Sequence, residues 1–260
     1  MSLELTLNCL HGFLGTSNDW DSFGESRCVK YDLFSPFSKV DPTFGLIELG
    51  NWINAEAITL PSPRVLLGYS LGGRIALHAL IQSPENWTAA IIVSANLGFK
   101  GNGWMSERQD RVRADENWAQ KFETEQWADV VSEWDAQAVF HQPQRVEYLS
   151  KDQDSAERGV PPRYEKDFSR MRLGNSLRNC SLGHQKDLRP DLRQLQVPIL
   201  WISGEQDAKY RSIAQEAVEL NPRFKSVVIP GGGHRIPWER PKEFAQSVAD
   251  YLEELNNGGL

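Results

Sequence analysis

The sequence has few cysteines, and their placement excludes two kinds of structural support. Its 260 residues contain only Cys9, Cys28 and Cys180, and none of them forms the closely spaced pair that binds zinc. An odd and scattered set of cysteines indicates reduced thiols in a core and a cytoplasmic protein, rather than a disulfide framework. We therefore expect no metal ion and no cofactor.

Basic residues and long apolar runs are also scarce. The chain has 28 Lys and Arg against 35 Asp and Glu, which gives a formal net charge of −7. Bulk electrostatics thus disfavour a nucleic acid or an anionic membrane as a partner. No apolar run approaches the roughly 20 residues of a membrane span, and Met1–Leu5 does not resemble a secretory signal. A small molecule is the partner that remains, and the oligomeric state is left open.

Short apolar runs alternate with helical patterns along most of the chain. The strand candidates are Leu3–Leu10, Cys28–Asp32, Val65–Leu67, Ala89–Val93, Val197–Ile202 and Ser226–Ile229. The helix candidates that accompany them include Phe44–Ile58 and Phe244–Leu255. This alternation is typical of an α/β fold, with a mostly parallel sheet that helices cover on both faces.

The middle of the chain interrupts that alternation. Residues 98–195 show helical periodicity and many charges but few strand-like runs. Within them, Ser106–Gln109 fits a capping box that opens a helix, and Thr124–Ala138 is a second helix candidate. The polar stretch Lys151–Pro162 contains two prolines and predicts a loop. The predicted domains are an α/β core of residues 1–97 and 196–260 and a helical cap of residues 98–195.

A glycine-bounded serine is the most informative motif. Gly68-Tyr69-Ser70-Leu71-Gly72 follows the apolar run Val65–Leu67 and precedes a helical pattern. A sharp turn between strand and helix lifts a serine hydroxyl to the top of a sheet, and glycines are needed where the two backbones approach closely. The context therefore predicts that Ser70 is a nucleophile or a base.

A serine hydroxyl needs a histidine partner that a carboxylate orients. Asp207 and His234 follow the last two predicted strands, at the strand ends where sheets of this kind place their ligands. They complete the chain order Ser, Asp, His. Glu205 stays open as a rival acid. Among the other histidines, we expect His11 to order the loop after the first strand.

An oxyanion that forms beside Ser70 needs two backbone N–H donors. The residue after the nucleophile is Leu71, which supplies the first donor. The second is expected from the loop that begins His11-Gly12, which points to Phe13.

Further motifs extend this set. They are Leu10–Gly15, Gly68–Arg74, Arg111, Asn117–Phe122, Trp134, Gly204–Tyr210 and Gly233–His234. With them the chain resembles α/β-hydrolase-fold enzymes over essentially its whole length. More narrowly, it resembles the 2-succinyl-6-hydroxy-2,4-cyclohexadiene-1-carboxylate synthases of menaquinone or phylloquinone biosynthesis. The sharp turn at Ser70, called the nucleophile elbow, and the triad of Ser70, Asp207 and His234 are common to many hydrolases. The set of Tyr69, Arg74, Arg111 and Trp134 is more specific.

The resemblance implies a lyase in a hydrolase fold. Its substrate would be 2-succinyl-5-enolpyruvyl-6-hydroxy-3-cyclohexene-1-carboxylate, which carries three carboxylates. The resemblance implies that Ser70, His234 and Asp207 remove the ring proton next to the succinyl ketone and that pyruvate is expelled. No acyl-enzyme is required.

A tricarboxylate in a closed site needs cations, and the planar fork of arginine suits carboxylates. Arg74 lies one helical turn after Ser70 and can face the same opening. We expect Arg74 and Arg111 to bind substrate carboxylates from opposite sides, with Tyr69 and Trp134 lining the site.

Two positions depart from the family pattern. The family has a further cap arginine where gapless matching puts Glu165, so Arg163, Arg170 and Arg172 are alternatives, of which we take Arg163 as the candidate. The loop at residues 32–38 lacks the glycine that the family commonly has after its second strand.

Two other functions remain. A carboxylesterase or carbon–carbon bond hydrolase would use the same fold and triad, so fold does not separate them. Its pocket would more often be apolar, whereas paired arginines favour a polyanion. A non-catalytic binding protein is disfavoured by the intact triad.

Overall fold

A computed structural model describes residues 5–23, 28–38, 44–101, 105–140 and 160–258 of the chain. Two predictions from the sequence therefore lie partly outside the described residues. They are the start of the strand candidate Leu3–Leu10 and most of the loop candidate Lys151–Pro162.

The described residues form one six-stranded sheet in which all neighbouring strands are parallel. Its strands are β1 Thr6–Leu10, β2 Cys28–Tyr31, β3 Arg64–Tyr69, β4 Ala89–Val93, β5 Ile199–Gly204 and β6 Phe224–Ile229. They lie in the order β2-β1-β3-β4-β5-β6. Each of the six strand candidates is confirmed, with ends that differ by a few residues. The predicted fold class, a parallel sheet flanked by helices, is correct.

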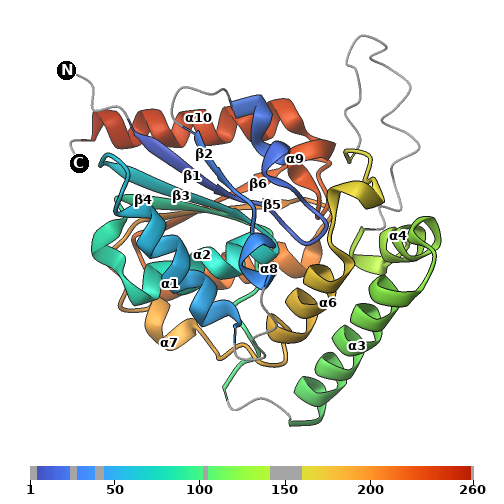
Figure 1. Ribbon diagram of the computed structural model, residues 1–260. Helices are drawn as coiled ribbons and strands as arrows, with labels where there is room; N and C mark the ends of the chain where they lie inside the picture. The colour runs from blue at the N-terminus through green and yellow to red at the C-terminus, as the bar shows by residue number, and fades with distance from the viewer. Residues whose placement is uncertain (1–4, 24–27, 39–43, 102–104, 141–159, 259–260) are drawn as a thin grey trace.

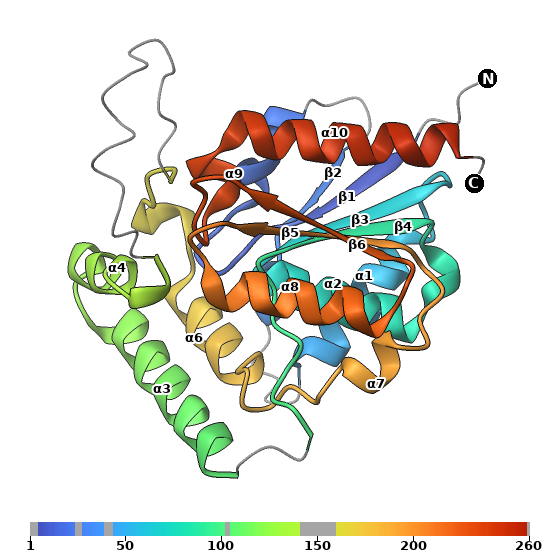
Figure 2. The same ribbon diagram turned by 180° about the vertical axis from the view of Figure 1, so that it is seen from behind.

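Helices cover both faces of the sheet (Figures 1 and 2). On one face lie α1 Leu46–Ala57, α2 Leu71–Gln82 and α8 Ala208–Leu220; on the other lie α10 Pro241–Asn257 and the short 3-10 helix η1 Ser17–Phe23. The central strand β4 needs cover on both faces, because all five of its side chains are buried. Ala90 and Ile92 join the core under α1 and α2, whereas Ile91 and Val93 join the core under α10.

Between β4 and β5 the chain leaves the sheet and forms a group of helices beside the carboxyl ends of the strands (Figure 1). Its members are α3 Met105–Thr124, α4 Trp127–Asp135, η4 Ala138–Phe140, η5 Glu165–Asp167 and α6 Arg170–Asn179. Helix α3 packs against α6. Ala119, Phe122 and Leu173 of this group are fully buried in the same apolar core as α1 and α2. The boundaries of the proposed cap stay a prediction.

Two helix predictions in this region differ from the structure at their ends. The candidate Thr124–Ala138 is confirmed as α4, which is three residues shorter at each end and begins only after the extended Gln126. Its apolar spacing is real, since Trp127, Val130 and Trp134 of α4 are all buried. Helix α3 already begins at Met105, so Ser106 lies inside its first turn and is not the residue that caps it.

The remaining elements are short. They are η2 Ser35–Ser38, η3 Pro84–Asn86, α7 Arg189–Leu192 and α9 Ile236–Glu239. In the part of the chain that the structure describes, no helix is both long enough and apolar enough to cross a membrane.

Candidate active site

Ser70 sits on a strained turn between β3 and α2. Its φ of 52° is in a region that non-glycine residues seldom adopt, and its N–H donates to the carbonyl of Val93 across 2.9 Å. The flanking glycines are needed for space. A Cβ on Gly72 would lie 2.3 Å from the carbonyl oxygen of Leu10, and one on Gly68 would lie 2.5 Å from that of Gly72. The turn thus has the geometry that exposes a serine hydroxyl above a sheet.

His234 and Asp207 extend a hydrogen-bonded chain from Ser70. The Oγ of Ser70 lies 3.3 Å from Nε2 of His234, and Nδ1 of His234 lies 2.8 Å from Oδ2 of Asp207. His234 and Asp207 are 4% and 8% exposed. With a proton on Nδ1 donated to Asp207, Nε2 is free to accept the proton of Ser70, which is the arrangement of a serine triad.

The geometry separates Asp207 from its rival Glu205. Glu205 is exposed, and its Oε2 accepts from the backbone N–H of Gly231 across 2.8 Å. The second oxygen of Asp207 accepts from the N–H of Tyr210 across 3.3 Å, so the carboxylate is fixed at the start of α8. The carboxylate that contacts His234 is therefore Asp207.

His11 has a structural place, as its position predicts. It is fully buried; its Nδ1 lies 2.8 Å from the carbonyl oxygen of Gly12, and its Nε2 accepts from the N–H of Leu33 across 3.0 Å. Burial lowers the pKa of His11 to about 4, so the ring is neutral. The ring joins the loop after β1 to the loop after β2. Of the other histidines, His78 is buried, His184 is exposed, and His141 lies outside the described residues.

The loop after β1 passes directly beside Ser70. A Cβ on Gly12 would lie 2.7 Å from the ring of Tyr69 and 3.5 Å from Cβ of Ser70, so the next residue, Phe13, borders the serine. Leu71 is the first residue of α2, and the first N–H groups of a helix have no partner inside the helix. Phe13, Ser70 and Leu71 line the same small cavity, and the assignment of the Phe13 and Leu71 amides as an oxyanion hole stays a prediction.

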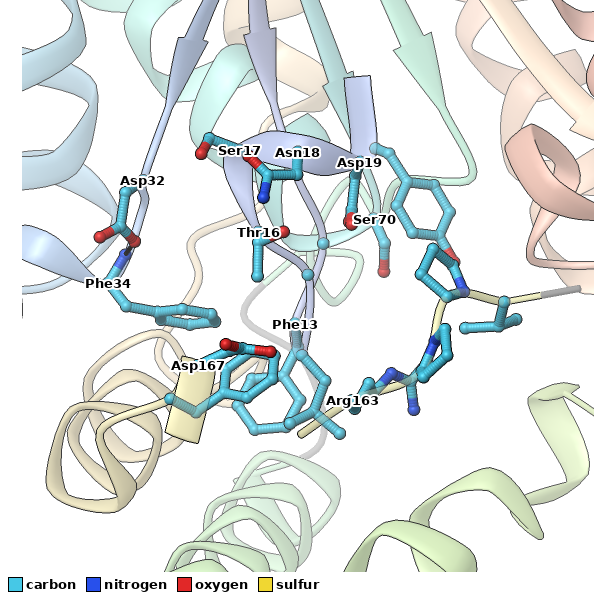
Figure 3. Close-up of a pocket in the computed structure, with 18 of the residues that line it drawn as sticks. Phe13, Thr16, Ser17, Asn18, Asp19, Asp32, Phe34, Ser70, Arg163 and Asp167 are labelled. Atoms are coloured by element: carbon cyan, nitrogen blue, oxygen red, sulfur yellow. Dashed lines mark hydrogen bonds between the residues drawn. The ribbon is translucent and has the colours of Figure 1, made fainter. Parts of the chain in front are cut away.

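Two cavities meet at Ser70. The larger has a volume of about 500 Å³ and the smaller about 100 Å³. Phe13, Ser70 and Trp134 line both of them. Figure 3 shows the larger cavity, with Phe13, Ser70, Arg163 and Asp167 among the labelled residues that line it. Ser70 therefore has access to a small space and a large one at once.

The small cavity is cationic and polar. Arg74 and Arg111 both line it, one from α2 and the other from α3 of the helical region, so the two arginines share one cavity. Nε of Arg74 donates to Oε1 of Gln185 across 2.5 Å, while its Nη2 is buried and has no hydrogen-bond partner among the described residues. Burial, with the charge of Arg111 acting in the same direction, lowers the pKa of Arg74 to about 10. Arg111 is less enclosed and pairs with the buried Asp115 across 2.8 Å.

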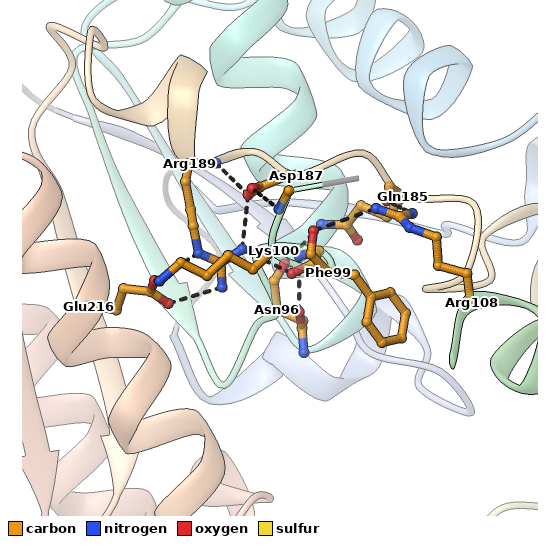
Figure 4. A network of polar contacts seen from close by, with 10 residues as sticks. Asn96, Phe99, Lys100, Arg108, Gln185, Asp187, Arg189 and Glu216 are labelled. Atoms are coloured by element: carbon orange, nitrogen blue, oxygen red, sulfur yellow. Dashed lines mark hydrogen bonds and ion pairs between the residues drawn. The ribbon is translucent and has the colours of Figure 1, made fainter. Parts of the chain in front are cut away.

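Gln185, which accepts from Arg74, belongs to a polar network with Asn96 and Arg108 (Figure 4). Nε2 of Gln185 donates to the backbone carbonyl of Asn96 across 3.0 Å, and the backbone carbonyl of Gln185 accepts from Nη1 of Arg108 across 2.7 Å. Gln185 is 1% exposed, so its amide has little freedom to turn. The guanidinium of Arg74, which borders the small cavity, is thus held through its Nε on Gln185.

The alternatives for the further cap arginine are also separated. Arg163 and Arg172 line the larger cavity. Arg170 instead donates to Glu165 and to the backbone carbonyl of Phe122, outside the two cavities. Only Arg163 is well enclosed, with a side chain that is 9% exposed and pairs with Asp135. The geometry favours Arg163, the residue taken as the candidate.

Aromatic rings enclose the space above Ser70. The ring of Trp134 lies 4.6 Å from that of Phe13, and the ring of Tyr69 lies 5.8 Å from that of His234. Tyr69 is 5% exposed, and burial raises the pKa of its hydroxyl well above the ordinary value. Both Tyr69 and Trp134 line the site, as predicted. The loop after β2 adds Asp32 and Phe34 to the wall of the larger cavity in place of the glycine of the family pattern.

Sequence reasoning missed three residues of the site. Ser94, at the end of β4, has a φ of 47° and a buried hydroxyl without a hydrogen-bond partner among the described residues, and it lines the small cavity. Tyr210 lines the same cavity, and Arg235 lines the larger one. Arg235 could have been found from its position next to His234. Nothing in the sequence marks Ser94, because its strain is visible only in the backbone.

The described residues contain no group of three or more His, Cys, Asp or Glu side chains arranged to hold a metal ion. The polar groups that the structure does bring together at the site are the chain of Ser70, His234 and Asp207 and several arginines.

Comparisons with known proteins identify the family of the chain. The sequence pattern of the alpha/beta hydrolase family matches residues 9–247. The chain is 30% identical over 250 residues to the 2-succinyl-6-hydroxy-2,4-cyclohexadiene-1-carboxylate synthase of Escherichia coli O1:K1 / APEC, covering 94% of this chain and 92% of that protein.

Solved structures share the fold. MenH from S. aureus has a TM-score of 0.80 at 23% identity, covering 97% of this chain and 96% of the other. The carboxylesterase CesB from Bacillus subtilis has a TM-score of 0.63 at 18% identity, covering 98% of this chain and 84% of the other. At these identities the two structures establish the fold and leave the reaction to the site.

Proposed function

Because the chain belongs to the alpha/beta hydrolase family and, within it, to the 2-succinyl-6-hydroxy-2,4-cyclohexadiene-1-carboxylate synthases, we propose that it is a carbon–oxygen lyase. Its substrate would be 2-succinyl-5-enolpyruvyl-6-hydroxy-3-cyclohexene-1-carboxylate, from which it eliminates pyruvate. The reaction would be a step of menaquinone or phylloquinone biosynthesis, and the substrate a small tricarboxylate.

The observation that carries this proposal is the unpartnered edge of Arg74 beside Ser70. A buried guanidinium with a free Nη2 is costly unless an anion completes it. Arg111 adds a second cation to the same cavity of about 100 Å³. An ester with an apolar acyl group would leave the Nη2 of Arg74 without a partner, whereas a carboxylate can accept from both arginines.

The triad would act as a base. His234 takes the proton of Ser70, and the serine oxygen then removes the ring proton next to the succinyl ketone. Asp207 stabilises the imidazolium that forms. The 3.3 Å between Oγ and Nε2 is a little longer than an optimal hydrogen bond, and contacts of this kind shorten when substrate is bound.

The backbone amides of Phe13 and Leu71 would hold the enolate. Negative charge develops on the ketone oxygen as the proton leaves, and fixed N–H donors in an enclosed site stabilise it without reorganisation. The electron pair then returns through the ring double bond and breaks the carbon–oxygen bond to the enolpyruvyl group. The released fragment takes up a proton and becomes pyruvate.

The position of the ketone also orients the substrate. Phe13 and Leu71 border the small cavity, and the succinyl carboxylate is two methylene groups from the ketone. With the ketone oxygen on the two amides, the succinyl carboxylate reaches Arg74 and Arg111. The ring and the enolpyruvyl group then occupy the larger cavity between Tyr69 and Trp134.

The direct test is incubation with the enolpyruvyl substrate while pyruvate and the diene are measured together. We expect one pyruvate for each diene, and no pyruvate with Ser70→Ala. A protein that released no pyruvate but hydrolysed carboxylic esters would instead be the carboxylesterase that the fold also permits.

A second test separates a base from a nucleophile. Rapid quenching during turnover, followed by mass spectrometry of the intact protein, should find no covalent adduct with the natural substrate. A stoichiometric acyl group on Ser70 would support a carboxylesterase or a carbon–carbon bond hydrolase, because acyl transfer passes through such an intermediate.

A further inference from the structure

Two enclosed arginines share one carboxylate on the far side of Ser70 from the small cavity. Arg163 precedes η5, and Arg235 directly follows His234. Nη1 of Arg163 and Nη2 of Arg235 both donate to Oδ1 of Asp135, across 2.6 and 2.5 Å. The two arginine side chains are only 9% and 10% exposed, and both line the larger cavity with Ser70.

The charges of this trio do not balance. Two guanidinium groups face a single carboxylate, which leaves one positive charge in a nearly closed place. Burial lowers the pKa of Arg163, and the charge of Arg235 lowers it further, while Asp135 opposes both. Asp135 is the last residue of α4, where the helix dipole disfavours a negative charge, so the two arginines are needed to hold it there.

Other acidic groups of the cavity do not cancel the excess. Asp32 and Asp167 line the same cavity but are exposed, so solvent screens them. Asp19 is half-buried, and burial raises its pKa to about 7, with the charge of Arg163 acting in the opposite direction. At neutral pH Asp19 is therefore protonated part of the time. The enclosed part of the cavity stays positive beside Arg163 and Arg235.

Both arginines are held firmly but keep donors to spare. The guanidinium of Arg235 lies 3.7 Å from the ring centre of Phe140, which fixes its plane. The backbone carbonyl of Arg163 accepts from Nε1 of Trp127 across 2.7 Å. Asp135 engages a single N–H of each guanidinium, whereas an arginine has five. The remaining N–H groups can bind a second carboxylate.

We propose that Arg163 and Arg235, bridged by Asp135, form a second carboxylate subsite that holds the carboxylate of the departing enolpyruvyl group. The assignment rests on the proposed function, because it takes the succinyl carboxylate to occupy the small cavity. The ring then extends into the larger cavity, where these arginines are the enclosed cations. When the carbon–oxygen bond breaks, its electron pair leaves with the oxygen of this same fragment. The subsite thus stabilises the departing anion.

The test measures the binding of pyruvate to the full-length protein by ligand-observed NMR titration, which requires no turnover. We expect Arg235→Gln and Arg163→Gln each to raise the dissociation constant of pyruvate about fivefold or more. Arg74→Gln removes a cation from the small cavity and should change it less than about twofold. Arg223→Gln, at an exposed position just before β6, is the matched control for a lost surface charge.

Arg235→Lys guards against a variant that does not fold. It keeps the positive charge beside Asp135 but loses the planar fork, so we expect about a threefold weaker binding of pyruvate. The proposal is overturned if the Arg235 and Arg163 variants bind pyruvate as the parent protein does. It is also overturned if Arg74→Gln weakens binding more than they do, because pyruvate would then occupy the small cavity.

Turnover distinguishes this proposal from the proposed function. If the parent protein releases no pyruvate from the enolpyruvyl substrate, the lyase assignment fails. Binding of pyruvate that still depends on Arg235 would then leave a carboxylate subsite of another reaction. If turnover occurs, Arg235→Gln should lower kcat as well as kcat/KM, since the charge of the leaving group grows in the transition state.

Discussion

The reactive groups and the cations of this site come from two regions that hold their side chains in different ways. Ser70, Asp207 and His234 follow the carboxyl ends of β3, β5 and β6; β3 and β5 are paired on both sides, and β6 is paired with β5. Arg111 and Arg163 belong to the helical region between β4 and β5, and each is positioned by one carboxylate, Asp115 or Asp135. The sheet edge thus fixes the reacting atoms, while the helical region holds its cations by exchangeable ion pairs.

This difference explains how one fold can serve several reactions. Proton transfer through the triad needs the distances between Ser70, His234 and Asp207 to be kept within a few tenths of an ångström, and a buried sheet provides this. Recognition of the substrate depends on which side chains the helices bring over the serine, and these can change without disturbing the sheet. Two cations of the site do not belong to the helical region. Arg74 lies one helical turn after Ser70, and Arg235 directly follows His234.

Removal of the serine hydroxyl should have the largest effect, because it takes away the reacting group that the sheet edge holds in place. We expect Ser70→Ala to lower kcat about 10³-fold or more, with an unchanged unfolding temperature. The backbone of the elbow, and with it the amide of Leu71, stays in place. Steady-state assay of pyruvate release measures the effect. Activity within about tenfold of the parent protein would exclude Ser70 as the base.

Removal of the arginines of the small cavity should have the next largest effect. We expect Arg74→Ala and Arg111→Ala each to lower kcat/KM for the tricarboxylate about 30- to 1000-fold, because a carboxylate loses its charged partner. Arg→Lys at either position should recover part of the loss.

A small neutral ester such as p-nitrophenyl acetate is the control substrate for these variants. It needs Ser70 but no cation, so its hydrolysis should change little. If both variants lost ester hydrolysis as severely as pyruvate elimination, the arginines would be structural and the tricarboxylate hypothesis would fail. Equal losses would also show that the two regions are not separable in the way described.

The sheet side of the site could be predicted almost completely from the sequence. Ser70 and His234 are marked by glycines at fixed offsets and by apolar strands before them. These signals are local, because a sharp turn at the end of a buried strand has few solutions. The choice between Asp207 and Glu205 required coordinates, since both follow β5 and only the direction of each side chain decides.

The helical side could be predicted only in part. Arg163, Arg170 and Arg172 look equivalent in the sequence, and their difference arises from where the chain enters α6. Arg235 was missed because its partner Asp135 lies 100 positions away in the chain. Ion pairs between distant segments leave no periodic pattern, whereas packing does.

Loss of the support behind Arg74 should have a smaller effect. Gln185→Met keeps the length of the side chain but loses the hydrogen bonds to Arg74 and to the carbonyl of Asn96. We expect KM for the tricarboxylate to rise about 5- to 20-fold with kcat nearly unchanged, since one bond to a charged group is lost. A merely structural role would instead lower both parameters, and would lower the hydrolysis of the neutral ester equally.

The smallest expected effect concerns Asp19, which lies in η1 and faces the larger cavity near Arg163. Burial raises its pKa from the ordinary 3.8 to about 7. The folded protein therefore holds this proton more tightly than the unfolded chain, and stability that is fully present below about pH 4 is lost as the pH rises through 7.

Asp19→Asn removes the titration. We expect the fall in unfolding temperature between pH 5 and pH 8 to become smaller by about 2–4 °C in the variant. Asp250→Asn, at an exposed position on α10, should leave the fall unchanged. Parallel curves for the parent protein and Asp19→Asn would mean that Asp19 is ionised throughout this range. The ionised carboxylate of Asp19 would then reduce the excess positive charge beside Arg163 and Arg235 in the larger cavity.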